Sequence, residues 1–154
     1  MNILVVYDSE FGNTEQLAEV IAERLHQHGH IELTTAEQAP RTMPEAMDLL
    51  VVGGPTQGHG ASPSLRSWLE GLEPVHGVRA AAFDTRFAKP RWLTGSAALM
   101  IARRLGGLGF HLVRDPESFF VTHSEGPLID GELDRAAAWA DMLANELVKA
   151  NSLG

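Results

Sequence analysis

Residues 9–14 combine small hydroxyl and amide side chains with a glycine, directly after a short apolar run. Backbone N–H groups at the start of a helix have no partner inside that helix, and the helix dipole favours an anion there. Ser9, Asn13 and Thr14 would add side-chain donors. The segment contains no lysine or arginine and matches neither GxxxxGK nor G-x-G-x-x-G, so it does not indicate an NTPase or dinucleotide loop. We therefore predict a cradle for a single terminal phosphate, with an ordinary capped helix start as the alternative.

A second candidate segment holds four glycines within the eight residues 53–60. Glycine lets the backbone approach a flat ligand closely and lets a peptide unit change orientation. We expect the residues between these glycines to form one wall of a binding site: Pro55, Thr56, Gln57, Gly58 and His59. His59 would lie at the edge of the ligand or, as is common for a lone histidine in a polar loop, in solvent.

A third candidate segment runs from Asp84 to Trp92. The backbone amides of Asp84 and Thr85 would approach the polar edge of the ligand. A flat aromatic side chain would supply a second wall, and we favour Trp92, with Phe87 as the alternative. The segment also holds a basic cluster in an otherwise acidic chain: Arg86, Lys89 and Arg91. Such a cluster is usually a solvated face, and the alternatives are that it offsets nearby negative charge or binds a phosphate-bearing partner.

The sequence gives little indication of disulfide, metal or nucleophilic chemistry. The chain has no cysteine, which excludes disulfides, thiolate metal sites and cysteine redox chemistry, and suits a reducing cytoplasm. His26, His28 and His30 diverge if they lie on a helix, so we expect no metal site. No G-x-S-x-G sequence marks a nucleophile, and we assign no catalytic residue. Residues 123–127 would either line the site or form a simple turn.

Size and charge narrow the classes of partner. The 154 residues correspond to one domain, 1–154, and 44% hydrophobic residues are enough to form a core. A formal net charge of -8 argues against a nucleic-acid binder and against an anionic membrane surface, and it permits docking to a basic protein face. The apolar run at residues 2–7 is too short to span a bilayer, and no basic segment precedes it as in a signal peptide.

The elements that must position these segments alternate along the chain. We predict strands at residues 3–7, 31–35, 48–54, 78–83 and 110–113, with 119–121 as a candidate continuation of the last. We predict helices at residues 13–28, 63–72, 95–108 and 131–150. Alternation of this kind gives an α/β fold, with a parallel sheet and helices on both faces. Ligands of such sheets bind at the carboxyl ends of the strands, where the three candidate segments lie.

The first segment, Ser9-Glu10-Phe11-Gly12-Asn13-Thr14, resembles the phosphate loop of flavodoxins, usually Ser/Thr-x-Thr-Gly-x-Thr. Phe11 stands where the family commonly has threonine, so one hydroxyl donor is missing, and we expect Glu10 to point into solvent. Length, element order and loop positions agree over nearly the whole chain. The resemblance implies a flavodoxin-like doubly wound, five-stranded parallel sheet of order 2-1-3-4-5, and a non-covalently bound FMN.

The other two segments extend the resemblance. Pro55-Thr56-Gln57-Gly58 aligns with a family segment that reads roughly Ser-Thr-Trp-Gly. The family's glycine carbonyl accepts a hydrogen bond from flavin N5 after one-electron uptake, and the resemblance gives this role to Gly58. Gln57 replaces the frequent tryptophan. In the third segment Phe87 matches a family tyrosine three residues past the aspartate, but this loop is longer than usual, so the register leaves Trp92 and Phe87 open.

The function that the resemblance implies is transfer of single electrons between a flavoprotein or ferredoxin-type reductase and a redox acceptor protein, by a cytoplasmic monomer. One alternative is an FMN-dependent NAD(P)H:quinone or metal reductase on the same fold. Another is a response-regulator receiver, which needs paired acids after the first strand and an aspartate ending the third. The chain offers only Asp8 at the first place and Gly53-Gly54 at the second.

Overall fold

The computed structural model describes residues 1–153 and contains one predominantly parallel sheet. Strands β1 (Asn2–Tyr7), β2 (His30–Thr35), β3 (Leu49–Gln57) and β5 (Arg79–Phe87) lie in the order β2-β1-β3-β5, and the short strands β6 (His111–Leu112) and β7 (Glu117–Val121) both pair with the outer side of β5. Counting β6 and β7 as one interrupted strand, this is the expected order 2-1-3-4-5. A two-residue strand, β4 (Gly60–Ala61), runs antiparallel to the end of β3.

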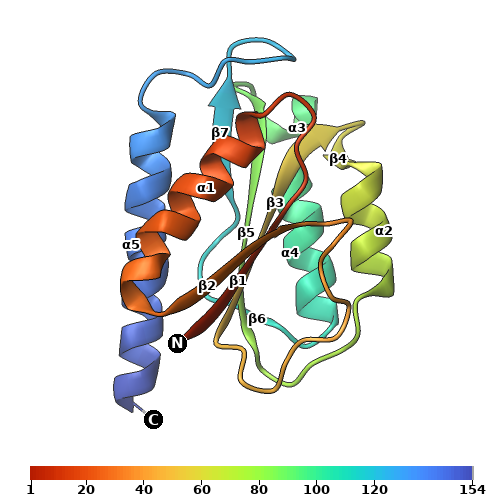
Figure 1. Cartoon of the computed structure of the whole chain (residues 1–154). Helices are drawn as coiled ribbons and strands as arrows, with labels where there is room; N and C mark the ends of the chain where they lie inside the picture. Colours follow the sequence, from red (N-terminus) through yellow and green to blue (C-terminus); the bar gives the residue numbers. More distant parts are fainter. Residues whose placement is uncertain (154) are drawn as a thin grey trace.

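Helices cover both faces of the sheet (Figure 1). Helix α1 (Asn13–Leu25), which ends in a 3₁₀ turn η1 (His26–His28), packs beside α5 (Glu132–Leu153) on one face. Helices α2 (Pro63–Gly71) and α4 (Ala97–Gly107) cover the other face, and the four-residue helix α3 (Arg91–Thr94) lies at the end of the sheet where β3, β5 and β7 finish. The predicted flavodoxin-like α/β fold is confirmed.

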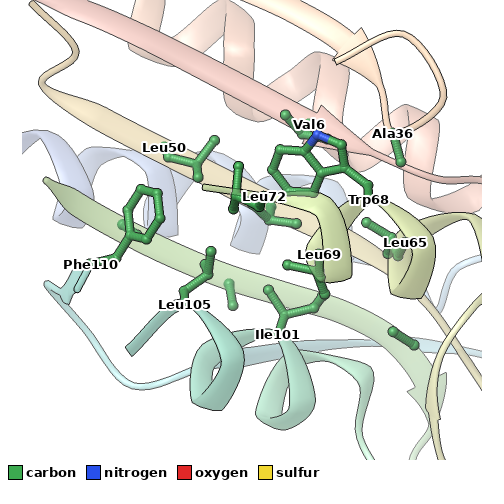
Figure 2. Packing of buried hydrophobic residues seen from close by; sticks show 14 of the residues in the cluster. Val6, Ala36, Leu50, Leu65, Trp68, Leu69, Leu72, Ile101, Leu105 and Phe110 are labelled. Carbon is green, nitrogen blue, oxygen red and sulfur yellow. The ribbon is translucent and has the colours of Figure 1, made fainter. Parts of the chain in front are cut away.

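Alternating residues of the central strands fill two separate cores. In β1, Leu4 and Val6 pack toward α2 and α4, whereas Ile3 and Val5 pack toward α1 and α5. Figure 2 shows the first core, in which Trp68 lies among leucines of α2 and the sheet. Burial of the sheet on both faces explains why its central strands read as continuous apolar runs rather than alternating ones.

Two central strands are longer than predicted. The parallel ladder between β3 and β5 persists through Gly54↔Asp84 and Pro55↔Thr85. Beyond it, β3 continues to Gln57 by pairing with β4, and β5 continues to Phe87 by pairing with β7. Residues 55–57 and 84–87, which were expected to lie in loops, therefore belong to strands and have a regular extended backbone. Helix α3 and strand β4 also fall within segments that were expected to be irregular.

Side chains of α5 fix the outer strand β7. The Glu132 carboxylate accepts hydrogen bonds from the Phe120 N–H (2.8 Å) and from Arg135 Nε (2.9 Å), and Arg135 also bonds Glu117 (3.1 Å) and lies over the Phe119 ring. Burial raises the pKa of Glu132, but the Arg135 and Phe120 hydrogen bonds and the Arg135 charge together outweigh burial, so its pKa lies below the ordinary value of 4.5. The ionised carboxylate therefore stabilises the fold.

We expect Trp139→Ala to lower the free energy of unfolding of the protein by about 3–5 kcal/mol, because the buried indole packs edge-on against Phe83 and Phe119. Trp92→Ala is the matched control: this side chain is 82% exposed, and its loss is expected to cost no more than about 0.5 kcal/mol. Urea denaturation followed by circular dichroism measures both. Similar costs for the two variants would contradict the placement of these tryptophans.

Glu132→Gln is expected to lower the free energy of unfolding at pH 7 by about 1.5–3 kcal/mol. Because the folded-state pKa of Glu132 is depressed, its contribution is complete above the unfolded-state value of 4.5 and is lost as pH falls through the folded-state value. The difference between wild type and variant should therefore shrink as pH is lowered from 7 to 3 in urea titrations. Glu23→Gln, at an exposed position on α1, is the control; a pH-independent difference for Glu132→Gln would refute the assignment.

Candidate functional site

A cavity of about 520 Å³ opens at the carboxyl ends of β1, β3 and β5. Its lining comes mostly from the three segments singled out in the sequence, and the rest comes from Leu93 and Thr94 of α3, from the end of β7 and from Ser124. The volume lies within the range of roughly 300–1,000 Å³ that is typical of small-molecule sites. Parallel pairing places these strand ends side by side, so residues distant in sequence meet around one space.

The first segment forms a tight turn into α1. Ser9 Oγ accepts hydrogen bonds from the N–H groups of Gly12 (3.1 Å) and Glu15 (3.3 Å), and Gly12 adopts a left-handed conformation with φ of 90°. Gly12 therefore shapes the turn but does not line the cavity. The N–H groups of Asn13 and Thr14, at the start of α1, have no hydrogen-bond partner within residues 1–153. These two donors meet the requirement for the predicted anion cradle.

Two side chains of this segment, Asn13 and Thr14, already form hydrogen bonds within the protein. Asn13 Nδ2 donates to the Glu125 carbonyl (3.2 Å), which ties the turn to residues 122–127. Thr14 is buried, and its Oγ1 lies 3.3 Å from Thr85 Oγ1. Two hydroxyls that share one hydrogen bond leave one O–H free to donate. Thr14 and Thr85 both line the cavity, so the pair still offers a donor to a ligand there.

Glu10 and Gln57 connect the first and second segments. Both line the cavity, and Gln57 Nε2 donates to Glu10 Oε2 at 2.8 Å. Glu10 is exposed to solvent, as expected, and its carboxylate also accepts this hydrogen bond. Phe11 also lines the cavity and is 49% exposed, at its outer border.

The second segment is a hairpin turn that closes β3 onto β4. Gly58 and His59 occupy its two central positions with φ of 55° and 70°, between the paired residues Gln57 and Gly60. The His59 carbonyl accepts a hydrogen bond from the Ser96 N–H (3.2 Å). All five predicted residues of this segment line the cavity: Pro55, Thr56, Gln57, Gly58 and His59.

Two of the glycines before this turn serve packing instead of ligand approach. A Cβ on Gly53 would lie 2.1 Å from the Phe83 ring, and one on Gly54 would lie 2.1 Å from Leu65. Neither residue lines the cavity. The glycine-rich composition therefore has two causes: close packing at Gly53, Gly54 and Gly60, and a left-handed backbone conformation at Gly58.

The third segment differs most from the prediction. Thr85, Arg86 and Phe87 line the cavity, but Asp84 does not. The Asp84 carboxylate is buried, and Oδ2 accepts hydrogen bonds from Ser96 Oγ (2.5 Å) and the Ala98 N–H (3.0 Å) at the start of α4. Asp84 therefore holds α4 against the sheet, an arrangement that depends on a contact 12 residues away in sequence.

Trp92, the favoured aromatic wall, also lies outside the cavity lining. It belongs to α3 and is 82% exposed, whereas its neighbours Leu93 and Thr94 line the cavity. The alternative aromatic, Phe87, lines the cavity and is 42% exposed. The extra residues of this segment fold into a helical turn, which directs successive side chains to different sides.

Five lining residues were not predicted as site residues: Lys89, Leu93, Thr94, Val121 and Ser124. Ser124 falls in the segment 123–127 that the sequence marked as a possible wall, and Lys89 was noted only as part of the basic cluster. Val121 ends β7, whose pairing with Phe87 brings it to the site. Strand pairing of this kind leaves no local signal in the sequence. No group of acidic or histidine side chains suited to a metal ion occurs in residues 1–153.

Electrostatically, one side of the cavity is basic. Arg86 Nε donates to Ser118 Oγ (2.9 Å), and its guanidinium lies 5.1 Å from the centre of the Phe120 ring. Burial lowers the pKa of Arg86, the Asp84 charge raises it and the Arg91 charge lowers it, with a net decrease. In the described part of the chain, no carboxylate lies within ion-pair distance of Arg86, Lys89 or Arg91.

Comparison with known proteins identifies the class. The family model described as Flavodoxin matches residues 5–89, more than half of the chain, and the chain belongs to this family. Oxidised flavodoxin 2 from Bacillus cereus has a similar fold, with 22% identity and a TM-score of 0.79 over 95% of this chain and 99% of that chain. A flavodoxin from the domain Archaea is also similar, with 21% identity and a TM-score of 0.76 over 96% of this chain and 99% of that chain. Rubredoxin:oxygen oxidoreductase from Desulfovibrio gigas has 17% identity and a TM-score of 0.70, and the match covers 96% of this chain but only 36% of that chain. A search of curated proteins gives no match.

Flavodoxins bind FMN, and this chain is an FMN-binding electron-transfer protein. The cavity fits that cofactor. Unpaired N–H groups of Asn13 and Thr14 lie at the start of α1, where the helix dipole favours a phosphate. Phe11, Phe87 and Leu93 supply apolar surface for a flat ring system. No helix in the described residues has the length and apolar character required to cross a membrane.

Removing the negative charge of Glu10 should tighten FMN more than riboflavin, since only FMN carries a phosphate. We expect Glu10→Gln to lower the Kd for FMN roughly fivefold at low salt, the equivalent of about 1 kcal/mol for one nearby charge in water, and to leave riboflavin nearly unchanged. Glutamine preserves an acceptor for Gln57. Quenching of flavin fluorescence measures both affinities.

Glu23→Gln, far along α1 from the cavity, is the control for net charge. An equal change for FMN and riboflavin in Glu10→Gln would show that Glu10 acts through the conformation of the turn. In that case the phosphate would not lie near this carboxylate.

Proposed function

We propose that this protein shuttles single electrons between a reductase and an acceptor protein. The observation that carries the proposal is the border of the cavity, where the aromatic side chains of Phe11 and Phe87 are about half exposed. A cofactor held there would keep an edge close to the surface, so a partner would exchange electrons by docking, without a substrate entering the protein. When bound, FMN supplies the capacity to accept and release one electron at a time.

The residues that would hold FMN divide between its two ends. The Asn13 and Thr14 N–H groups and the Thr14–Thr85 hydroxyl pair would donate to the phosphate. The backbone of residues 55–59 would form one wall for the ring, and Phe87 the other, while Phe11 and Leu93 would exclude water at the border. Acceptance of a flavin N5 hydrogen bond by the Gly58 carbonyl stays a prediction from the family resemblance.

The reductase would be a flavoprotein or ferredoxin-type reductase, and the acceptor a redox protein. We further propose that residues 1–154 form a single domain that acts as a monomer in the cytoplasm. The absence of cysteine supports a reducing compartment, because the chain needs no disulfide. The same chemistry would be available to an NAD(P)H:quinone or metal reductase, and the test below separates the two.

FMN-loaded protein is mixed anaerobically with NADPH, with and without a catalytic amount of ferredoxin–NADP⁺ reductase, and flavin bleaching is followed at its visible absorbance band. We expect the flavin to bleach at least about 100-fold faster with the reductase, because an electron carrier has no site of its own where NADPH could bind and transfer a hydride. Steady oxidation of NADPH by the protein alone, with a quinone or ferric salt as acceptor, would identify the reductase alternative instead.

A further inference from the structure

An exposed apolar corner lies beside the cavity, formed by Trp92 and Leu93 of α3. Trp92 is 82% exposed and Leu93 is 50% exposed. Trp92, Phe11 and Phe87 are the exposed aromatic side chains of the described residues. Exposed apolar surface gathered at one place commonly marks an interaction site. Phe11, Phe87 and Leu93 line the cavity and would be partly covered by the cofactor, but Trp92 would not.

The backbone beneath Trp92 is firmly held. Arg86 donates to the carbonyls of Phe87 and Lys89, and Arg91 donates to the Pro116 carbonyl (3.1 Å) and to Ser118 Oγ (3.3 Å). Behind α3, a Cβ on Gly95 would lie 2.2 Å from the His59 carbonyl oxygen, so this turn sits directly against the second segment. A fixed backbone lowers the conformational entropy that is lost when a partner covers the side chain it carries.

The charge around this corner differs from that of the rest of the molecule. The formal net charge is -8, yet Arg86, Lys89 and Arg91 fall within six residues and have no carboxylate at ion-pair distance in residues 1–153. The nearest acid in sequence, Asp84, is buried. The hydrogen bonds of Arg86 and Arg91 go to carbonyl and hydroxyl oxygens and leave their positive charges in place. Glu10, an acid that does line the cavity, belongs to the first segment.

We propose that the Trp92–Leu93 corner docks one redox partner of the carrier, and that the partner's matching surface is apolar and bordered by carboxylates. The inference rests on the proposed carrier function. Trp92 supplies the desolvated anchor, as tryptophan commonly does at interfaces, and the cations of residues 86–91 steer the approach. The contact would be small, as in transient electron-transfer complexes, and it would bring the partner next to the open border of the cavity.

The test uses two one-electron haem acceptors of opposite charge, the acidic cytochrome b5 and the basic cytochrome c. FMN-loaded protein is reduced with dithionite, freed of excess reductant and mixed with each cytochrome in a stopped-flow instrument. Calorimetry with oxidised cytochrome b5 gives the Kd of the complex. The variants are Trp92→Ser and Lys89→Glu, and all rates are expressed per bound FMN.

For cytochrome b5, Trp92→Ser is expected to raise Kd and lower the second-order rate about tenfold. Lys89→Glu should lower the rate about two- to fivefold at low ionic strength, and this effect should disappear near about 1 M salt. Cytochrome c should not be slowed by Trp92→Ser, because Trp92 lies outside the cavity lining. Val148→Ser and Lys149→Glu on α5 are matched controls, since one is an exposed apolar residue and the other is the second of the chain's two lysines.

Each failure has a distinct meaning. If wild type reduces both cytochromes but the variants behave like their controls, the docking surface is refuted and the carrier function stands. If wild type reduces neither cytochrome, the proposed function fails. Loss of FMN from Trp92→Ser, seen as a lower flavin-to-protein absorbance ratio, would place Trp92 in the cofactor site and overturn the proposal. So would a wild-type dimer that Trp92→Ser converts to a monomer in gel filtration, because a second copy would then be the occupant.

Discussion

Parallel pairing of β1, β3 and β5 determines where everything functional in this protein lies. Tyr7 pairs with Gly53, Gly53 pairs with Phe83, and Pro55 pairs with Thr85, so the strands end within a few residues of one another at the same edge. The segments that follow β1, β3 and β5 therefore all contribute to one cavity. The register depends in turn on dense packing: Gly53 leaves room for the Phe83 ring, which packs against Phe119 and Trp139 under α5. The packing of Gly53 against Phe83 in the core therefore also sets where the strands end around the cavity.

Polar contacts behind the cavity convert this edge into a defined site. Ser9 closes the turn before α1 through two backbone N–H groups, and Asp84 holds the start of α4 through Ser96 and Ala98. These side chains act on backbone position, not on a ligand. The groups left for a ligand are mainly backbone N–H groups and apolar walls, which suits a cofactor that carries its own chemistry. The protein supplies orientation and exclusion of water.

Charge is distributed unevenly around the site. Glu10 is hydrogen-bonded to Gln57 in one part of the lining, whereas Arg86 and Lys89 line another part and Arg91 lies next to it on α3. An electron carrier has to recognise a donor and an acceptor in turn, and each complex must dissociate quickly. Surfaces of opposite charge on the two sides of one cavity would let partners of different charge approach the same cofactor from different directions. The anchoring of α3 by two arginines keeps the basic side in a fixed place.

The sequence alone determined the alternation of strands and helices, the strand order by resemblance, and the three segments around the site, because buried parallel strands read as apolar runs and loop composition reflects local backbone demands. Local patterns did not determine the extension of β3 and β5, the inclusion of Val121 in the lining, or the roles of Asp84 and Trp92. Those depend on pairing with β7, on Ser96 and Ala98, and on Arg91 reaching Pro116 and Ser118. Contacts between residues 12 to 34 positions apart leave no periodic signal, so only the tertiary structure decided which side chains face the cavity and which face solvent.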